Sequence, residues 1–539
     1  MELPSLPAYV TTVVIVAIVV FCYRFAVSPT VRALSSRPTV WRATLATAVA
    51  SAPLAFLPAP DPGPFRWFIV FVTALLTWQG TTSDYDVTHP IGPQRSAKVA
   101  LLLLAVASCF WAPALLPWLA VYCGRLRGWK HHAMMPLRLL KAYLAWFFVG
   151  TALSTPEPST GLVLVLGCVS LSHYVKPAWS KARLGPRPWS WAWHNRTHYL
   201  TASAYSWGWA RFLPAETVTG ILRRARAVDR PLNILTVLVE SAGLVAFHDR
   251  SLLVAVLVAT AVFNLTVVLA SGIFFWENIC TNAALALTVA LLPDQEYDAA
   301  FGWPAVVIAL SIFILSTADL LWQPWHLGWW DSPFTARVNW QVETASGATL
   351  GLYNDFMCPY EREFGRVLGY FLTSEPILHG HLGIVWDPEL RDRLVRAAGD
   401  PAELHHLKQI HGRAQTNAEQ AREHIAFLTT MFIRLNSGTP KGPLPRWLRR
   451  LKAPGGQLYQ WGDLPPYRGE EPVRRITIRY QERCYRPETG DFVLLADEVV
   501  QEIHLPPQRP TTGVLHAQSF HRLRDQPRNR AEPLHRRAP

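Results

Sequence analysis

The sequence predicts an all-α polytopic membrane domain of about eight to ten transmembrane helices, followed by a small α+β soluble domain. Three observations predict this fold class. Hydrophobic residues make up 50% of the 539 residues and charged residues only 17%, a balance that excludes a disordered or fibrous protein and argues against an ordinary soluble enzyme. Apolar runs fill residues 1–330. After Trp330 the composition changes to that of a soluble domain.

The apolar runs approach the roughly 20 residues that a helix needs to cross the hydrocarbon layer of a bilayer. Two shorter segments, Ala43–Leu57 and Trp67–Trp78, are broken or flanked by prolines, so we expect tilted or partial spans there. The longer candidates are Tyr9–Tyr23, Ala97–Cys123, Leu137–Ser154, Gly161–Val175, Leu232–Phe247, Leu252–Ala270, Ile279–Leu292 and Trp303–Leu321.

Lys and Arg residues predict the orientation of the spans, because cytoplasmic connections carry an excess of them. No basic residue precedes the first apolar run and several arginines follow it, which indicates an uncleaved span with the N-terminus outside. Basic connections at 125–138 and 176–230 are placed inside, which leaves the C-terminal domain in the cytoplasm. Two connections on the same side of the membrane must be separated by an even number of spans. Between the arginine-rich first connection and the connection at 125–138, however, the number of predicted spans is odd. Either one short segment is re-entrant or interfacial, or one inside assignment is wrong.

The excess of Lys and Arg in cytoplasmic connections also explains the net charge of +13. In a soluble protein it would suggest nucleic acid, but here the apolar runs make it a topology signal. We therefore predict the lipid bilayer as a partner, and no nucleic acid.

Helices are predicted within the expected cytoplasmic domain, residues 331–505. Asp387-Pro388 and Asp400-Pro401 each place an N-cap acid before a proline at the first helical position. Two or three helices should therefore run through to about Asn436.

Strands and a basic tail are predicted after these helices. Ile476, Ile478 and Tyr480 alternate with polar residues, and a turn at Pro487–Gly490 separates them from Val493–Ile503. Thr349–Tyr353 is a smaller strand candidate. Residues 506–539 are rich in Pro and Arg without apolar periodicity, which predicts a disordered basic tail near anionic lipid headgroups.

Charged residues within apolar spans are the clearest indication of function, because each costs roughly 2.5 to 3.5 kcal/mol on insertion scales. Glu240 lies in the middle of one span, where a functional cavity and a structural hydrogen bond between helices are both open. His173 ends another span and Lys181 follows it. A desolvated lysine loses its charge more easily and can act as a general base. We expect Lys181 to be that base, with Glu240 and His173 as polar partners in one cavity.

Tryptophans gather between Lys176 and Arg211. Tryptophan is typical of the membrane interface, so an interfacial helix or re-entrant segment explains most of them. The functional interpretation is a cavity mouth in which amphipathic rings hold a flat ligand. The candidate cofactor-binding residues are then Trp189, Trp193, His194 and His198.

The same histidines raise the question of a metal. His194 and His198 are four residues apart and would share one face of a helix. With His131-His132 they suggest the histidine boxes of membrane di-iron desaturases. The sets are too few and wrongly spaced for that site, so no metal is predicted.

A loose series of features runs through the membrane half. His131-His132 precedes a basic span start, a later span leads to Lys181 and a Trp/Gly-rich turn, and a further span carries Glu240 in its middle. Gly272–Phe275 and Asp331–Phe334 continue the series. This pattern resembles the vitamin K-dependent γ-carboxylases and their bacterial relatives, the horizontally transferred transmembrane (HTTM) domain proteins.

The resemblance covers roughly residues 1–345 and implies oxygen chemistry on a reduced quinone. In that family a lysine amine deprotonates the hydroquinone, O₂ adds, and the resulting alkoxide removes a substrate proton. Lys181 is the residue most similar in position to the family lysine, with Lys176 a nearby competitor. The C-terminal part does not resemble the peptide-binding carboxylase domain and is expected on the cytoplasmic side, so peptide γ-carboxylation is not expected.

Two classes of function follow. The first is a membrane oxidoreductase or carboxylase-like enzyme acting on a quinone or another lipid-soluble small molecule. The second is a non-catalytic lipid-binding scaffold or transporter whose C-terminal domain docks a cytoplasmic protein. Transport is disfavoured because the sequence has no paired halves with matched broken helices.

Overall fold

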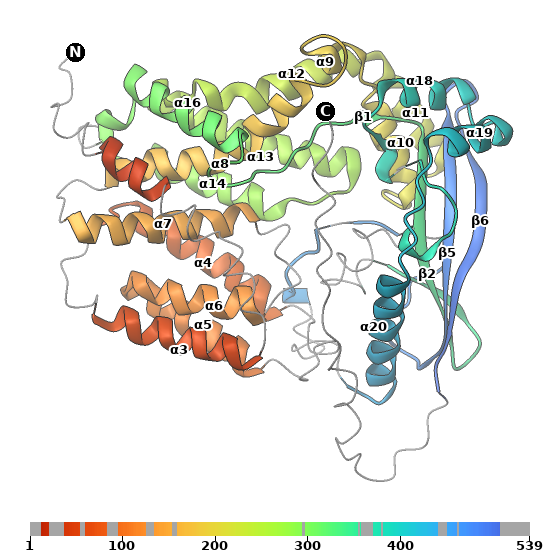
Figure 1. Ribbon diagram of the computed structural model, residues 1–539, viewed down its shortest axis with the longest axis horizontal. Helices are drawn as coiled ribbons and strands as arrows, with labels where there is room; N and C mark the ends of the chain where they lie inside the picture. The colour runs from red at the N-terminus through yellow and green to blue at the C-terminus, as the bar shows by residue number, and fades with distance from the viewer. Residues whose placement is uncertain are drawn as a thin grey trace.

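The computed structural model is mostly helical, and its antiparallel strands are confined to the C-terminal region (Figure 1). The described residues are 12–20, 37–53, 60–82, 95–125, 134–153, 159–293, 297–353, 356, 370–378, 381–439, 450–456, 458–460 and 463–506. The first predicted span is thus described only in part, and the predicted tail lies almost wholly outside the described residues.

Helices form the part of the chain before residue 330. Most of them lie on the left of Figure 1, with α9 near the top middle and α10 and α11 on the right, beside the strands. Short 3-10 turns, such as η4 (Ala242–Leu244) and η5 (Ala246–His248), extend or connect them. The helices are α3 (Arg37–Ser51), α4 (Phe65–Thr82), α5 (Arg95–Phe110), α6 (Leu115–Arg125), α7 (Met134–Leu153), α8 (Ser159–Ala182), α9 (Ser190–His194), α10 (His198–Trp207), α11 (Ala215–Ala227), α12 (Asp229–Ser241), α13 (Arg250–Ser271), α14 (Trp276–Ala290) and α16 (Trp303–Thr317).

Within the described residues, three helices are long and apolar enough to cross a membrane: Ser159–Ala182, Asp229–His248 and Arg250–Ser271. They coincide with three of the predicted spans. Shorter apolar helices include α16, whose 15 residues rise about 22 Å, less than the roughly 30 Å of a hydrocarbon core. The predicted count of eight to ten spans is therefore not confirmed.

The helical region exposes apolar side chains on its surface and buries some polar side chains in its interior. On α13, the exposed residues Val258, Val262 and Leu265 lie at helical spacing on one face. The opposite face buries Thr260 and Asn264. This arrangement reverses the pattern of a surface helix in a soluble protein, and it is typical of helices that face lipid.

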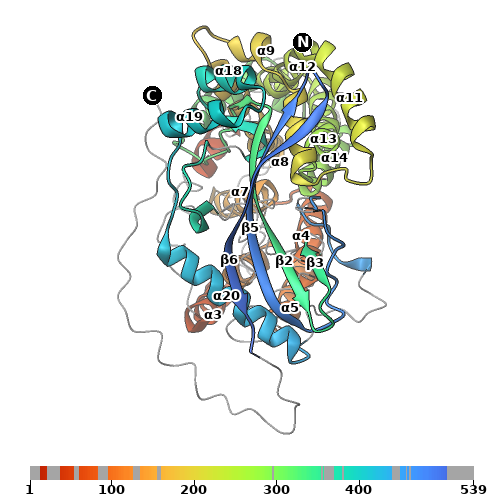
Figure 2. The same cartoon turned by 90° about the vertical axis from the view of Figure 1, so that its right-hand side faces the viewer.

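The C-terminal region is built on a four-stranded antiparallel sheet in the order β3-β2-β5-β6. Figure 2 shows β2, β5 and β6 twisting together along one side of the molecule. A separate two-stranded pair joins β1 to β4. The strands are β1 (Trp330–Asp331), β2 (Phe334–Thr344), β3 (Thr349–Leu352), β4 (Ile384–Val385), β5 (Val473–Arg486) and β6 (Asp491–His504).

Three helices, α18 (Pro388–Ala397), α19 (Pro401–His411) and α20 (Ala418–Asn436), accompany the sheet. The prediction of helices beginning after Asp387 and Asp400 is confirmed, since each carboxylate accepts a hydrogen bond from the backbone N–H two residues later. The predicted strand, turn and strand after residue 473 form the β5–β6 hairpin. Strand β2 was not predicted.

The sheet and the helical region share one continuous hydrophobic core that crosses residue 330. The two faces of β2 contact different elements. On one face Trp340 donates a hydrogen bond from Nε1 to His424 of α20. On the other face Thr335 and Arg337 bind Trp207 and the Ser206 carbonyl of α10. Helix α10 therefore joins the two parts of the chain.

Candidate functional site

A buried ion pair joins two of the apolar helices. Lys181, in the last turn of α8, places Nζ 2.7 and 2.8 Å from the two carboxylate oxygens of Glu240 on α12. Lys181 is only 7% exposed and Glu240 only 3%. The sequence singled out Glu240 as a charge within an apolar span, and Lys181 as a lysine that desolvation would make a general base. The structure brings them together, and each is the other's counter-charge.

Helix α9 closes over this pair. Lys181 Nζ lies 5.3 Å from the centroid of the Trp191 ring, within range of a cation–π contact. The ring is fixed by a hydrogen bond of 2.7 Å from Trp191 Nε1 to the carbonyl of Trp329. The pair therefore has an aromatic side as well as an ionic one. No feature of the sequence distinguishes Trp191 from the neighbouring tryptophans.

A second group of polar residues links α9 and α10 to β1. Asn195 Nδ2 donates to Asp331 Oδ2 at 2.7 Å, and Asp331 N–H donates to Asn195 Oδ1 at 2.9 Å. Asn233 of α12 donates to the Asn195 carbonyl at 3.0 Å. Burial raises the pKa of Asp331 to about 7, against the opposing effect of hydrogen bonds from Asn195 and Trp329. The carboxyl group can thus change its protonation near neutral pH.

A histidine and an aspartate form a third buried pair. His198 Nδ1 lies 2.6 Å from Asp229 Oδ2, and His198 N–H donates to Asp229 Oδ1 at 2.9 Å. His198 Nε2 is buried without a hydrogen-bond partner among the described residues. With the carboxylate on Nδ1, the neutral ring carries its proton there and presents Nε2 as an acceptor. This geometry suits acceptance of a proton.

His173 does not join the Lys181–Glu240 pair. Its Nε2 lies 2.6 Å from Arg138 Nη1, and its Nδ1 lies 2.8 Å from the Val169 carbonyl. It precedes Lys181 by eight residues, or roughly 12 Å along α8. The predicted convergence of the three residues is therefore met only by Lys181 and Glu240.

The predicted cofactor-binding residues are divided as well. Trp189 and Trp193 are 39% and 55% exposed, and His194 is also exposed. Only His198 is buried. In helix α9, which is five residues long, residues two apart differ by roughly 200° around the axis, so Trp191 turns toward Lys181 while Trp193 faces outward. Exposed tryptophans fit the interfacial role that the sequence favoured for most of them.

Polar groups continue from the ion pair into the helical region. Tyr174, two turns before Lys181 on the same face of α8, accepts hydrogen bonds from Asn264 at 2.5 Å and Asn282 at 2.7 Å. Asn282 also accepts one from Ser170 at 2.7 Å. The interior facing α8 is therefore hydrogen-bonded across α13 and α14, which fixes the helices around the site.

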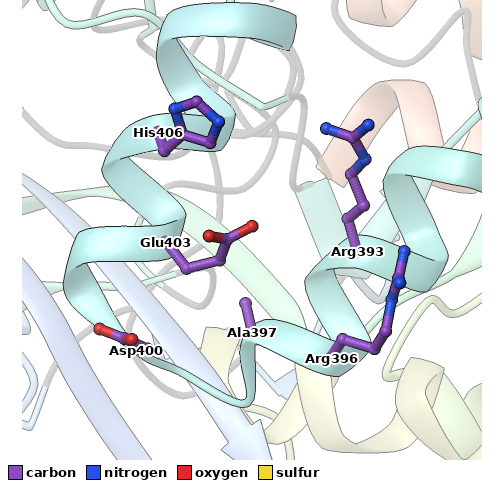
Figure 3. Close-up of a pocket in the computed structure, with 6 residues that line it drawn as sticks. All are labelled: Arg393, Arg396, Ala397, Asp400, Glu403 and His406. Atoms are coloured by element: carbon purple, nitrogen blue, oxygen red, sulfur yellow. The ribbon is translucent and has the colours of Figure 1, made fainter.

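A cleft of about 530 Å³ lies elsewhere, between α18 and α19. Figure 3 shows basic side chains on one helix opposite acidic side chains and a histidine on the other. Its lining residues are Arg393, Arg396, Ala397, Asp400, Glu403 and His406. None of them was predicted as a site residue.

Metal binding has no support in the described part of the chain, where no group of three or more His, Cys, Asp or Glu residues could hold an ion. No family model, curated protein or solved structure matches the chain. The γ-carboxylase resemblance accordingly stays a prediction.

Asp229, Asn195 and Asp331 are the site residues that sequence reasoning missed. Asp229 stands two residues before Pro231, a helix-start signal that explains its position but not its partner. Asn195 lies in the short connection between α9 and α10, and Asp331 lies in the two-residue strand β1. Only the packing of α12 and β1 against the connection between α9 and α10 brings them together.

Proposed function

We propose that the chain is a multi-pass membrane enzyme that performs acid–base chemistry on a lipid-soluble substrate, with its C-terminal domain in the cytoplasm. The observation that carries the proposal is the Lys181–Glu240 ion pair, which is buried among apolar helices and bounded by Trp191. Ionisable residues inside membrane helices are costly, so they tend to mark substrate or proton pathways. The apolar outer face of α13 supports the membrane setting.

The first substrate to test is a reduced quinone. Its ring can lie against an indole, and its hydroxyl group carries a proton for a base to remove. In a low-dielectric site, transfer of the proton from the Lys181 ammonium to Glu240 leaves a neutral amine beside a neutral acid. The amine then takes the hydroxyl proton of the substrate and becomes an ammonium again, which stabilises the substrate anion by charge.

The roles differ among the residues. Lys181 is the base, Glu240 holds its exchangeable proton, and Trp191 is the aromatic wall. His173 belongs to this proposal only as a positioning residue, since it fixes α8 through Arg138. His198, oriented by Asp229, is a second proton acceptor near the same helix junction.

A second candidate is a non-catalytic lipid-binding scaffold with a cytoplasmic protein partner. Two observations favour it. Both oxygens of Glu240 are already engaged by Lys181, as in a clamp between helices. The cleft between α18 and α19 presents charges of both signs, which suits a protein partner.

The test compares small molecules extracted from detergent-purified proteins by mass spectrometry. Wild type is expected to carry near-stoichiometric quinone and to oxidise the reduced quinone in the presence of O₂. The Lys181→Met/Glu240→Gln variant, which leaves no unpaired charge, should lose the oxidation. Lys176→Met is the matched control on the same helix and should retain it. If all three proteins carry only bulk phospholipid, the enzyme proposal fails and the scaffold stands.

A further inference from the structure

Three arginines from separate parts of the chain converge between α10 and the sheet. Arg211 follows α10, Arg337 lies on β2 and Arg483 lies on β5. Asp463 bridges two of them, with Oδ1 3.2 Å from Arg211 Nη1 and Oδ2 2.9 Å from Arg483 Nη2. We call Arg211, Arg337 and Arg483 the arginine cluster.

Arg337 is the most buried member, at 1% exposure. Its Nε and Nη2 donate to the Gln481 side-chain oxygen at 2.9 and 2.6 Å, and its Nη1 donates to the Ser206 carbonyl. These acceptors are neutral. Burial, followed by the positive charges of Arg483 and Arg211, lowers the pKa of Arg337. The other two arginines are therefore close enough to repel it.

The charges of the cluster do not balance. Three guanidinium groups face one carboxylate, Asp463, so two positive charges have no counter-charge in these contacts. Asp463 is itself exposed and is partly screened by water. Buried charges are normally paired, because the cost of desolvation is large.

The unpaired hydrogen-bonding groups around the cluster are all donors. Arg211 Nε and Nη2, Arg483 Nε and Asn339 Nδ2 are buried without a partner among the described residues. Asn339 is two residues beyond Arg337 on the same face of β2 and is 2% exposed. The three unsatisfied guanidinium donors beside surplus positive charge point to a missing acceptor that is anionic.

We propose that the arginine cluster binds a phosphate dianion, either inorganic phosphate or a phosphate monoester. A dianion supplies the two missing negative charges, and its oxygens provide acceptors for the three unpaired guanidinium donors. Guanidinium groups match phosphate geometry with paired N–H bonds, which a single carboxylate cannot satisfy from three directions. The Tyr205 ring, 4.8 Å from the Arg211 guanidinium carbon, holds that side chain in place.

The site is independent of the proposed quinone chemistry. It lies outside the three long apolar helices, and none of its residues contacts Lys181 or Glu240. The phosphate group has two sources with the same chemistry: a soluble phosphate monoester, or the headgroup of a phosphatidic acid molecule at the membrane surface.

The test measures the thermal unfolding midpoint of the full chain in detergent as inorganic phosphate or glycerol 3-phosphate is added, with sodium chloride matching the ionic strength. A ligand that binds only the folded state raises the midpoint with concentration. Phosphatidic acid added to the detergent micelles, with phosphatidylcholine as the control lipid, tests the lipid source in the same thermal assay. Arg211→Gln and Arg483→Gln should weaken binding about tenfold or more, since each removes a charge-assisted contact.

Arg475→Gln is the matched control, because Arg475 lies on the same strand and is paired with Glu343 and Glu502. It should bind like wild type. A response to soluble phosphate identifies a soluble ligand, and a response only to phosphatidic acid identifies a headgroup. Either response supports the site if Arg211→Gln shifts it to about tenfold higher ligand concentration or removes it. No response to either source, or an equal response in Arg211→Gln and wild type, overturns the proposal.

Discussion

Replacing Lys181 alone is expected to be more damaging than replacing both members of its ion pair. Lys181→Met keeps most of the length of the side chain but removes the ammonium that binds both oxygens of Glu240 at 2.7 and 2.8 Å. The remaining carboxylate, 3% exposed, would be a buried charge without a partner, which costs about 3–5 kcal/mol. The Lys181→Met/Glu240→Gln variant leaves no charge, so its loss should stay below about 2 kcal/mol.

The assay is the free energy of unfolding in detergent micelles for wild type, both single variants and the double variant. The interaction energy from this cycle should exceed about 1.5 kcal/mol. Lys176→Met provides a comparison on the same helix, because its partner Asp319 is exposed and water can solvate it. Equal losses of unfolding free energy in Lys181→Met and in the double variant would refute the reasoning. Such a result would mean that water reaches the unpaired Glu240 carboxylate.

Two further predictions concern the buried carboxyl group of Asp331 and the backbone at two glycines. Burial raises the pKa of Asp331 to about 7 from 3.8, so the folded chain holds a proton that the unfolded chain releases. The stabilising contribution is therefore complete below about pH 4 and is lost as pH rises to about 7; Asp331→Asn should remove this slope in thermal unfolding, and an unchanged slope would contradict the assignment. Gly208 has φ of +108° and a Cβ there would lie 1.8 Å from the Gln460 carbonyl oxygen, so Gly208→Ala should cost more than about 2 kcal/mol. Gly220→Ala, in open space on α11, should instead gain roughly 0.5–1 kcal/mol, and similar unfolding midpoints for the two variants would count against this account.

Local signals predicted the elements that depend on a few neighbouring residues. An acid followed by proline begins α18 and α19, because both the cap and the fixed φ of proline act within one turn. Alternation predicted β5 and β6 for a similar reason. Strand β2 alternates as well, from Phe334 to Val342, but its polar residues are also buried because α10 covers that face. A local sequence pattern cannot predict that another element will cover the polar face of a strand.

For the site, too, the sequence predicted individual residues but not which residues they contact. The cost of a charge within a span identified Glu240, and the basicity of a desolvated lysine identified Lys181. Which residue would be the partner depends on how α12 packs against α8, 59 residues away in sequence. His173 was selected for its position at a span end, yet the nearest polar group proved to be Arg138 on α7.

The two groups of buried charge differ in what they require. Lys181 and Glu240 are neutral as a unit, with every carboxylate oxygen bound, so the pair is stable without a ligand and its function rests on moving a proton within it. The arginine cluster carries surplus positive charge and unpaired donors, so its own electrostatics call for an anion. The proposed enzyme chemistry can therefore fail while the phosphate site stands. Helix α10 binds Asp229 through its first residue, His198, and Arg337 through its penultimate residue, so it connects the start of α12 to the arginine cluster.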